Sequence, residues 1–249
     1  MKLISIIMPY FRKQKYLEQS VNSILSQSYE NFEIIIIDDE LSLESKSVLS
    51  KISKLDKRIK IISNPFNLGA GLARNNGIKI AKGEFIAFCD CDDLWSENKL
   101  KLQLEFMYKN NYEFSFTSYE IINDFGKKIG QRLAKNIITF NDLIKSCDIG
   151  LSTVVIKKEL FKNKNFCFPN LKTKEDYVLW LKFAKQGVNI FGLNNKLSVW
   201  RKSENSLSSS IFQKLLDGYR VYYIYLGYGV IKSLISLLIL SLNYMRKRN

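Results

Sequence analysis

Short apolar, β-type runs alternate with helical patterns through the first half of the chain, and this alternation is the feature that most constrains the fold. The β-type runs cover residues 3–8, 32–37, 59–62 and 85–89. The helical patterns cover residues 16–26, 44–54, 70–81 and 97–109. Strands separated by helices in this way form a mostly parallel sheet covered by helices. The sequence therefore predicts an α/β fold with a mostly parallel central sheet flanked by helices.

The pattern loosens after the fourth helix. Short strands are expected near 114–122 and 153–156, a turn at 124–126 and a helix over 177–185. No Gly-, Pro- or Ser-rich linker marks a domain boundary, and the 249 residues are enough to bury one full hydrophobic core. These observations indicate one α/β domain with an appended C-terminal segment.

Histidine is absent from the chain, and this absence excludes several kinds of chemistry. Neither a Ser-His-Asp or Cys-His nucleophile nor an imidazole-bound zinc site can form without it. The four cysteines include no CxxC pair, which disfavours a zinc or iron-sulfur centre and indicates a reducing cytoplasm. Residues 1–8 run straight into a strand pattern, so we expect no secretory leader. Acid-base and metal chemistry must rest mainly on carboxylates.

Two groups of carboxylates directly follow predicted strands. Asp38 and Asp39 follow the second β-type run, and Asp90, Asp92 and Asp93 follow the fourth. Ligands of open α/β sheets bind beyond the carboxyl ends of the strands, so both groups are candidates for binding. Three carboxylates in one loop repel one another unless a cation offsets them, and Mg²⁺ or Mn²⁺ prefers oxygen ligands and completes its shell with substrate phosphates. A turn or a helix cap is the alternative for each group, for Asp93 above all.

A third acidic pair, Glu175 and Asp176, stands where a helix begins. A carboxylate in this position can complement the helix dipole, or it can act as a general base that takes a proton from an attacking hydroxyl. The residues alone leave both alternatives open.

Basic residues outnumber acidic ones by 38 to 24, and the formal charge of +14 suits an anionic partner. Arg74 and Arg201 could meet a pyrophosphate, helped by backbone N–H groups of a helix that starts near 69–72. Arg74 could equally be a solvated helix residue. We expect other lysines, including Lys13 and Lys60, to be ordinary surface charge.

The tail is hydrophobic and basic. Residues 221–231 and 233–245 are uncharged, Lys232 separates them, and three basic residues follow at 246–248. The length permits a membrane span, but Lys232 and nearby glycines and tyrosines weaken that alternative. An interfacial amphipathic helix on anionic cytoplasmic lipids is favoured over a span or a packed soluble helix.

Motifs in these segments, MPYF, IIDDE, GLARNNG, FCDCDDLW and KEDYVLW, together resemble bacterial glycosyltransferase family 2 over residues 3–205. The resemblance implies the GT-A fold, whose sheet is Rossmann-like, and an inverting transferase that uses a nucleotide-sugar donor with Mn²⁺ or Mg²⁺. Cys91 stands where the family usually has Ser or Ala, and Glu40 where Gly is common. The QxxRW motif of processive members does not occur, so transfer of a single sugar is favoured.

The resemblance assigns a role to each matching residue. Asp92 matches the metal ligand of the Asp-Xaa-Asp motif, and Asp90 assists it on the donor side. Asp176 matches the catalytic base, with Glu175 and Trp180 expected at the acceptor. The residues expected to bind the donor are Pro9, Tyr10, Phe11, Asp38, Asp39, Arg74, Asp90 and Arg201.

The resemblance also implies a division of labour along the chain. Residues 1–120 form the nucleotide-sugar-binding half and 121–217 the acceptor-binding half of one catalytic domain. Residues 218–249, which lie beyond the resemblance, form the hydrophobic and basic C-terminal tail, expected from its own pattern to associate with the membrane. We expect an enzyme of cell-surface polysaccharide or lipooligosaccharide synthesis that lies peripherally on the inner face of the plasma membrane. Its expected partners are a UDP-sugar, a glycan or lipid-linked acceptor and the membrane surface, with no nucleic acid.

Three rival classes make different demands on the sequence. A sugar nucleotidyltransferase usually has a Gly-rich basic loop after the first strand, and that loop has no glycine here. A dinucleotide-dependent dehydrogenase needs GxGxxG after that strand, which is also missing. A non-catalytic basic module would explain the charge of +14 but not three aligned acidic motifs.

Overall fold

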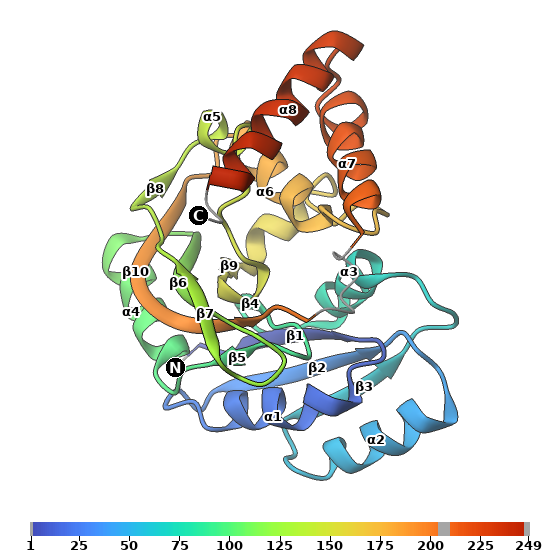
Figure 1. The fold of residues 1–249 in the computed structure, drawn as a ribbon. Helices are drawn as coiled ribbons and strands as arrows, with labels where there is room; N and C mark the ends of the chain where they lie inside the picture. The colour runs from blue at the N-terminus through green and yellow to red at the C-terminus, as the bar shows by residue number, and fades with distance from the viewer. Residues whose placement is uncertain (1, 204–209, 247–249) are drawn as a thin grey trace.

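The computed structural model describes residues 2–203 and 210–246, and it confirms the predicted α/β fold (Figure 1). The strands are β1 (Ile4–Tyr10), β2 (Phe32–Asp38), β3 (Ile59–Ser63), β4 (Phe85–Phe88), β5 (Leu94–Trp95), β6 (Phe114–Ile122), β7 (Lys128–Arg132), β8 (Ile137–Ile138), β9 (Val155–Lys157) and β10 (Ile190–Arg201). The α-helices are α1 (Gln14–Leu25), α2 (Leu43–Ser53), α3 (Ala70–Ile80), α4 (Lys99–Asn110), α5 (Phe140–Leu143), α6 (Glu175–Lys185), α7 (Ile211–Arg220) and α8 (Val230–Arg246). Two 3₁₀ turns, η1 (Leu151–Thr153) and η2 (Lys158–Lys162), and a π-helical turn, η4 (Val221–Tyr225), complete the described elements.

The strands form a sheet with the order β3-β2-β1-β4-β9-β6-β10-β5. Neighbours from β3 to β4 are parallel, as the alternation of strands and helices predicts. Strand β9 then runs antiparallel to both β4 and β6, and β10 lies parallel to β6 with two irregularities in register. The parallel strands carry almost continuous apolar runs because helices cover both faces of this half of the sheet.

Alternate residues of β1 point into two different cores. Ile6 and Met8 belong to the core under α1, α2 and α4, whereas Ile7 belongs to the core under α3 and α6. Helix α3 approaches β1 closely at Gly77, where an added Cβ would lie 2.6 Å from Cγ2 of Ile7. The register of β1 with β2 and β4 brings the carboxyl ends of all three strands to one edge of the sheet. That edge carries the acidic motifs.

Helices α7 and α8 stand side by side and project from the body of the molecule (Figure 1). Their base is anchored: buried Asp217 accepts hydrogen bonds from the backbone N–H and the hydroxyl of Thr173, both at 3.0 Å. The Tyr222 hydroxyl donates to the carbonyl of Ile144 at 2.7 Å. The boundary expected at residue 218 falls inside α7. Within residues 2–203 and 210–246, no helix combines the length and apolarity needed to cross a membrane.

Candidate active site

Asp38 is the last residue of β2, Asp39 directly follows it, and both are almost completely buried. One carboxylate oxygen of Asp39 accepts hydrogen bonds from the side-chain amide of Asn64 at 2.7 Å and the backbone N–H of Leu68 at 2.8 Å. The other accepts from the backbone N–H of Gly69, also at 2.8 Å. Asp39 therefore fixes the loop that leads into α3. Its contact with a donor stays a prediction.

Asp38 organises the turn that follows β2. Its carboxylate accepts from the backbone N–H groups of Glu40 and Leu41 at 3.1 and 3.2 Å and from the hydroxyl of Ser45 at 3.3 Å. Leu41 has a φ of 65°, an unfavourable value for a leucine, and the hydrogen bond to Asp38 stabilises this conformation. Glu40 accepts the backbone N–H of Arg12 at 2.8 Å, so the departure from the family's Gly ties two loops of the site together.

The three carboxylates after β4 diverge to different partners. Asp92 accepts from the Lys13 ammonium at 2.5 Å, and Asp90 from the Arg74 guanidinium at 2.7 Å. Asp93 is buried and accepts from the Ser152 hydroxyl at 2.5 Å and from the backbone N–H of Arg201 at 2.9 Å. The cations paired with Asp92 and Asp90 offset part of the repulsion that the sequence predicts.

The interpretation of Asp93 as a helix cap is wrong. The next helix, α4, has Asn98 at its N-cap, and Asp93 instead joins the acidic loop to β10 and η1. Burial raises the pKa of Asp93 well above its ordinary value, and the neighbouring carboxylates of Asp92 and Asp90 raise it further. Asp93 therefore belongs to the scaffold of the site.

Asp90 and Asp92 are the carboxylates that could hold a divalent cation. Among the described residues, no cluster of three or more acidic or cysteine side chains is arranged as a metal site. A magnesium-type ion usually takes only one or two protein carboxylates and fills its remaining positions with water and substrate phosphates. Two hard oxygen donors at the ligand-binding edge fit that requirement. Burial raises the pKa of Asp92, while the Lys13 ammonium opposes this effect.

Arg74 lies at the centre of the site, and its side chain is only 4% exposed. One terminal nitrogen donates to Glu175 at 2.6 Å, and the other donates to Asp90 at 2.7 Å. Burial by itself would lower the pKa of Arg74, but the carboxylates of Asp90 and Glu175 outweigh it and raise that pKa. The alternative of a solvated helix residue is therefore wrong, because Arg74 bridges two of the predicted acidic motifs.

Glu175 and Asp176 form the first turn of α6. Lys174 is the N-cap and makes no side-chain capping bond, and Asp176 accepts the backbone N–H of Tyr177 at 2.7 Å. Burial raises the pKa of Glu175 to about 7, with Arg74 opposing and Asp176 reinforcing the shift. Burial also raises the pKa of Asp176, and Arg74 again opposes it. A carboxylate with a raised pKa at a ligand-binding edge is suited to general-base chemistry.

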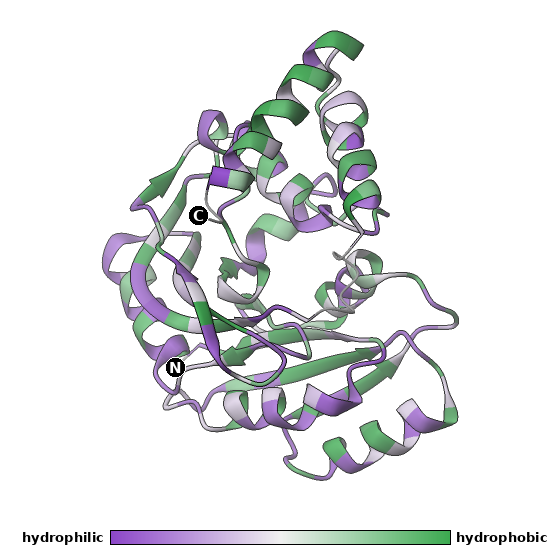
Figure 2. Cartoon of the chain, viewed as in Figure 1, coloured by the Kyte–Doolittle hydropathy of each residue, from purple (hydrophilic) through white to green (hydrophobic). Residues whose placement is uncertain are grey.

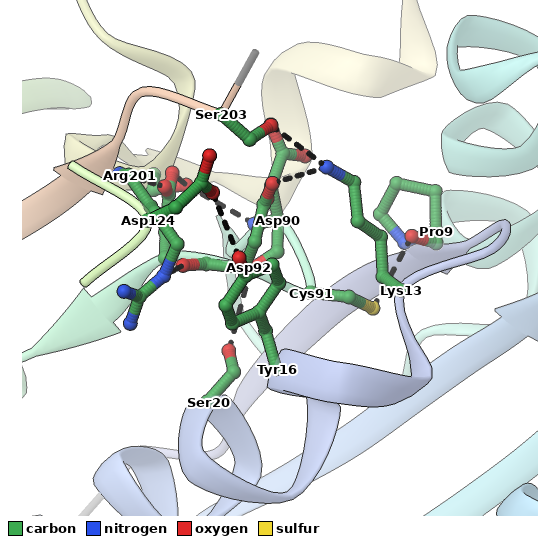
Figure 3. A network of polar contacts seen from close by, with 12 residues as sticks. Pro9, Lys13, Tyr16, Ser20, Asp90, Cys91, Asp92, Asp124, Arg201 and Ser203 are labelled. Carbon is green, nitrogen blue, oxygen red and sulfur yellow. Dashed lines mark hydrogen bonds and ion pairs between the residues drawn. The ribbon is translucent and has the colours of Figure 1, made fainter. Parts of the chain in front are cut away.

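Some predicted site residues lie deeper than expected. Trp180 is fully buried and packs edge-to-face on Phe114 and Phe168, so any effect on an acceptor acts through the position of α6. Arg201 is 4% exposed and donates to the carbonyl of Asp92 at 3.1 Å, in the network of Figure 3. Contact of Arg201 with a pyrophosphate stays a prediction.

The carboxyl end of β1 is anchored to the acidic loop. The Cys91 thiol donates to the carbonyl of Pro9 at 3.3 Å, a hydrogen bond that a Ser at this position could also make and an Ala could not. The Tyr10 side chain is fully buried, whereas Phe11 is partly exposed. The Arg12 guanidinium lies over the Phe11 ring, with its Cζ 5.0 Å from the ring centroid. Phe11 is therefore the member of this segment that can most readily contact a donor.

Lys13 is the site residue that the sequence analysis missed. It was expected to be surface charge, but its ammonium binds Asp92, and its side chain is only 25% exposed (Figure 3). The sequence could have predicted this contact. Lys13 follows β1, and β1 pairs directly with β4, which leads into the acidic loop. A lysine at one strand end opposite aspartates at the next is a candidate ion pair.

This mostly parallel sheet, with acidic motifs at the carboxyl ends of β2 and β4, has the architecture expected of the GT-A fold. Residues 5–166 match the family described as Glycosyl transferase family 2. The chain is 40% identical over 215 residues to the Escherichia coli UDP-Glc:alpha-D-GlcNAc-diphosphoundecaprenol beta-1,3-glucosyltransferase WfgD, covering 86% of this chain and 82% of WfgD. It is 34% identical over 221 residues to the putative teichuronic acid biosynthesis glycosyltransferase TuaG of Bacillus subtilis, covering 88% and 87%.

Solved structures agree on the fold. TarS 1-349 of S. aureus in complex with UDP-GlcNAc superposes with a TM-score of 0.75 at 23% identity, covering 95% of this chain and 70% of that one. The mannosyltransferase PcManGT of Pyrobaculum calidifontis in complex with GDP-Man and Mn²⁺ gives 0.69 at 14% identity, covering 94% and 69%. The chain belongs to glycosyltransferase family 2 and is a glycosyltransferase. The nucleotidyltransferase, dehydrogenase and non-catalytic alternatives are therefore wrong.

Proposed function

We propose that the enzyme transfers a single sugar from a UDP-sugar to a hydroxyl of a lipid-linked glycan, with inversion at the anomeric carbon. The observation that carries this proposal is the Arg74 bridge, because it joins Asp90 on the donor side to Glu175 beside the expected base. Two relatives support the substrate class: WfgD is described as using UDP-Glc and a diphosphoundecaprenol-linked GlcNAc, and TuaG as acting in teichuronic acid biosynthesis.

Asp176 is the proposed general base. Its carboxylate takes the proton of the acceptor hydroxyl while that oxygen attacks the anomeric carbon, and the bond from this carbon to the donor phosphate breaks. The electron pair leaves with the nucleoside diphosphate. One displacement inverts the configuration, so the mechanism needs no covalent enzyme intermediate.

Asp92 and Asp90 are the residues proposed to hold Mn²⁺ or Mg²⁺. When bound, the ion would neutralise charge on the leaving diphosphate. Arg74 orients Asp90 through its hydrogen bond, and Asp39 orders the loop before α3 by accepting the backbone N–H groups of Leu68 and Gly69. These residues bind and position the donor, and Asp176 handles the proton.

The first prediction concerns metal-dependent binding. Titration calorimetry with UDP-sugars is expected to show binding that Mn²⁺ strengthens, and Asp92→Asn is expected to abolish this strengthening because an amide is a much poorer ligand for a hard cation. Asp56→Asn is the matched control, since Asp56 pairs with Arg58 before β3, away from the acidic motifs. Absence of UDP-sugar binding by the wild type with Mn²⁺ present would refute the proposed donor.

We also propose that α7 and α8 dock on the cytoplasmic face of an anionic membrane. Large apolar side chains are exposed along both helices, and α8 is predominantly hydrophobic in Figure 2. The most exposed are Ile211 and Phe212 of α7, Ile224 of the connecting turn η4, and Val230, Ile231, Leu234, Ile235, Leu238 and Met245 of α8. The formal charge of +14 complements an anionic surface, and the lipid-linked acceptor of WfgD would have to be reached there.

The second prediction tests this docking with substitutions at exposed positions. Deletion of the tail would remove buried Tyr222 and so confuse folding with binding. Ile231→Glu with Leu234→Glu is expected to lower binding to phosphatidylglycerol vesicles by ~10²-fold or more, since burying each such side chain contributes about 1.5–3 kcal/mol. Leu43→Glu, at an exposed position on α2, is the matched control for flotation. Membrane docking would be contradicted if the wild-type protein did not bind the vesicles, or if it formed a dimer through these helices instead.

A further inference from the structure

The contact between Lys13 and Asp92 is a partly buried ion pair within the site. The Lys13 ammonium lies 2.5 Å from a carboxylate oxygen of Asp92 and 3.2 Å from the hydroxyl of Ser203 (Figure 3). The two charged side chains are 25% and 13% exposed, so solvent screens them less than an ordinary surface pair. An ammonium has three N–H donors, and these contacts use two of them.

The backbone around Lys13 is held in place from both sides. The Tyr10 carbonyl accepts the backbone N–H of Asp39 at 3.0 Å, and the Pro9 carbonyl accepts the thiol of Cys91. Lys13 itself is the N-cap of α1, whose first turn it closes by accepting the backbone N–H groups of Tyr16 and Leu17 at 3.0 Å. The ammonium therefore reaches Asp92 from a fixed main chain, which argues against a chance contact of a solvated side chain.

Lys13 and a divalent cation need the same carboxylate. Lys13 contacts one of the two carboxylate oxygens of Asp92. A metal ion bound through that oxygen would displace the ammonium, and its binding without nucleotide would be weakened by the loss of the ion pair. A bound nucleoside diphosphate changes this balance, because its phosphate oxygens offer the displaced ammonium a new anionic partner close by. Lys13 then exchanges one anion for another, and its charge is never left unpaired.

We propose that Lys13 is an exchangeable counter-ion of Asp92 that moves to the donor diphosphate, so that metal and nucleotide bind cooperatively and neither binds well alone. This inference rests on the proposed metal-assisted use of a UDP-sugar. Because coupling between two ligands is reciprocal, UDP must raise the affinity for Mn²⁺ by the same factor by which Mn²⁺ raises the affinity for UDP. Part of that factor comes from the transfer of Lys13.

The third prediction is that Lys13→Gln uncouples the two ligands. In calorimetric titrations, the variant is expected to bind Mn²⁺ alone about tenfold more tightly than the wild type, since Asp92 no longer has a competing cation. The factor by which Mn²⁺ strengthens UDP binding is expected to fall about tenfold, because the diphosphate no longer gains the ammonium. Thermal melting of each variant verifies folding.

Two further variants separate this effect from simple loss of charge. Lys15→Gln removes the same charge two residues away at an exposed position and is expected to behave as the wild type. Lys13→Arg keeps the charge and is expected to keep the weak binding of Mn²⁺ alone. Equal Mn²⁺ affinities and coupling factors for the wild type and Lys13→Gln would overturn the inference, as would a Lys13→Arg variant that matches Lys13→Gln.

The titrations also distinguish failure of this inference from failure of the proposed function. If Mn²⁺ strengthens UDP binding equally in the wild type and Lys13→Gln, the metal-assisted function stands and the role of Lys13 falls. If the wild type binds no UDP with Mn²⁺ present, the proposed donor chemistry fails, and the inference about Lys13 fails with it.

Discussion

Replacement of Asp176 by asparagine is expected to lower kcat by ~10²–10⁴-fold, the usual contribution of a positioned general base. Asparagine has nearly the same shape, and its side-chain oxygen can still accept the backbone N–H of Tyr177. The first turn of α6 should therefore survive, and UDP-sugar binding should change little. Initial rates of UDP release with a lipid-linked acceptor, combined with calorimetric donor binding, measure the two effects separately.

The pH dependence supplies a second test of the same residue. A general base works only when it is deprotonated, so wild-type kcat/KM should rise with pH on the acidic side of its profile. Because burial raises the pKa of Asp176, this rise should occur at a higher pH than it would if the base were an exposed aspartate. The residual rate of Asp176→Asn should lack this rise. Retention of both the rate and the acidic limb in Asp176→Asn would exclude Asp176 as the base.

Strands β1 to β4 could be predicted from the sequence because each is a short apolar run between helical patterns. Burial on both faces removes any polar alternation from β2, whose seven residues are all buried. The carboxylates of the site could be predicted for a related reason. Parallel strands bring their carboxyl ends to one edge, so acidic residues that directly follow two such strands must lie near each other.

The second half of the sheet could not be predicted in this way. No strand was predicted over β10, whose sequence contains Gly192, Asn194 and Asn195 and whose register with β6 shifts twice. Its place next to β6 depends on pairing between residues 76 to 79 positions apart, which leaves no local periodicity to detect. The Lys13–Asp92 and Arg74–Glu175 ion pairs were missed for the same reason, since they join residues 79 and 101 positions apart in the sequence.

Arg74→Met is expected to destabilise the fold by about 3–5 kcal/mol, because it leaves the carboxylates of Asp90 and Glu175 without the buried cation between them. For a chain of this size, that change corresponds to a decrease in Tm of roughly 6–20 °C in thermal unfolding. Lys162→Met is the matched control: its pair with Glu159 is exposed on both sides and contributes at most about 1 kcal/mol.

The size of the Arg74→Met defect should also depend on pH. Arg74 opposes the effect of burial on Glu175, so its removal should raise the pKa of Glu175 beyond about 7. The ordinary pKa of a glutamate, 4.5, applies to Glu175 in the unfolded chain, so the native state binds this proton more tightly than the unfolded chain does. The native state therefore loses stability as the pH rises from about 4.5 through the pKa of Glu175 in the folded protein. The difference in Tm between wild type and Arg74→Met should therefore be larger at pH 8 than at pH 5.

Adding Glu175→Gln to Arg74→Met should recover part of the lost stability, because the double variant no longer buries the Glu175 carboxylate without a cation. A single variant that unfolds within 2 °C of the wild type at both pH values would show that the bridge between the donor motif and α6 contributes little to holding the site together.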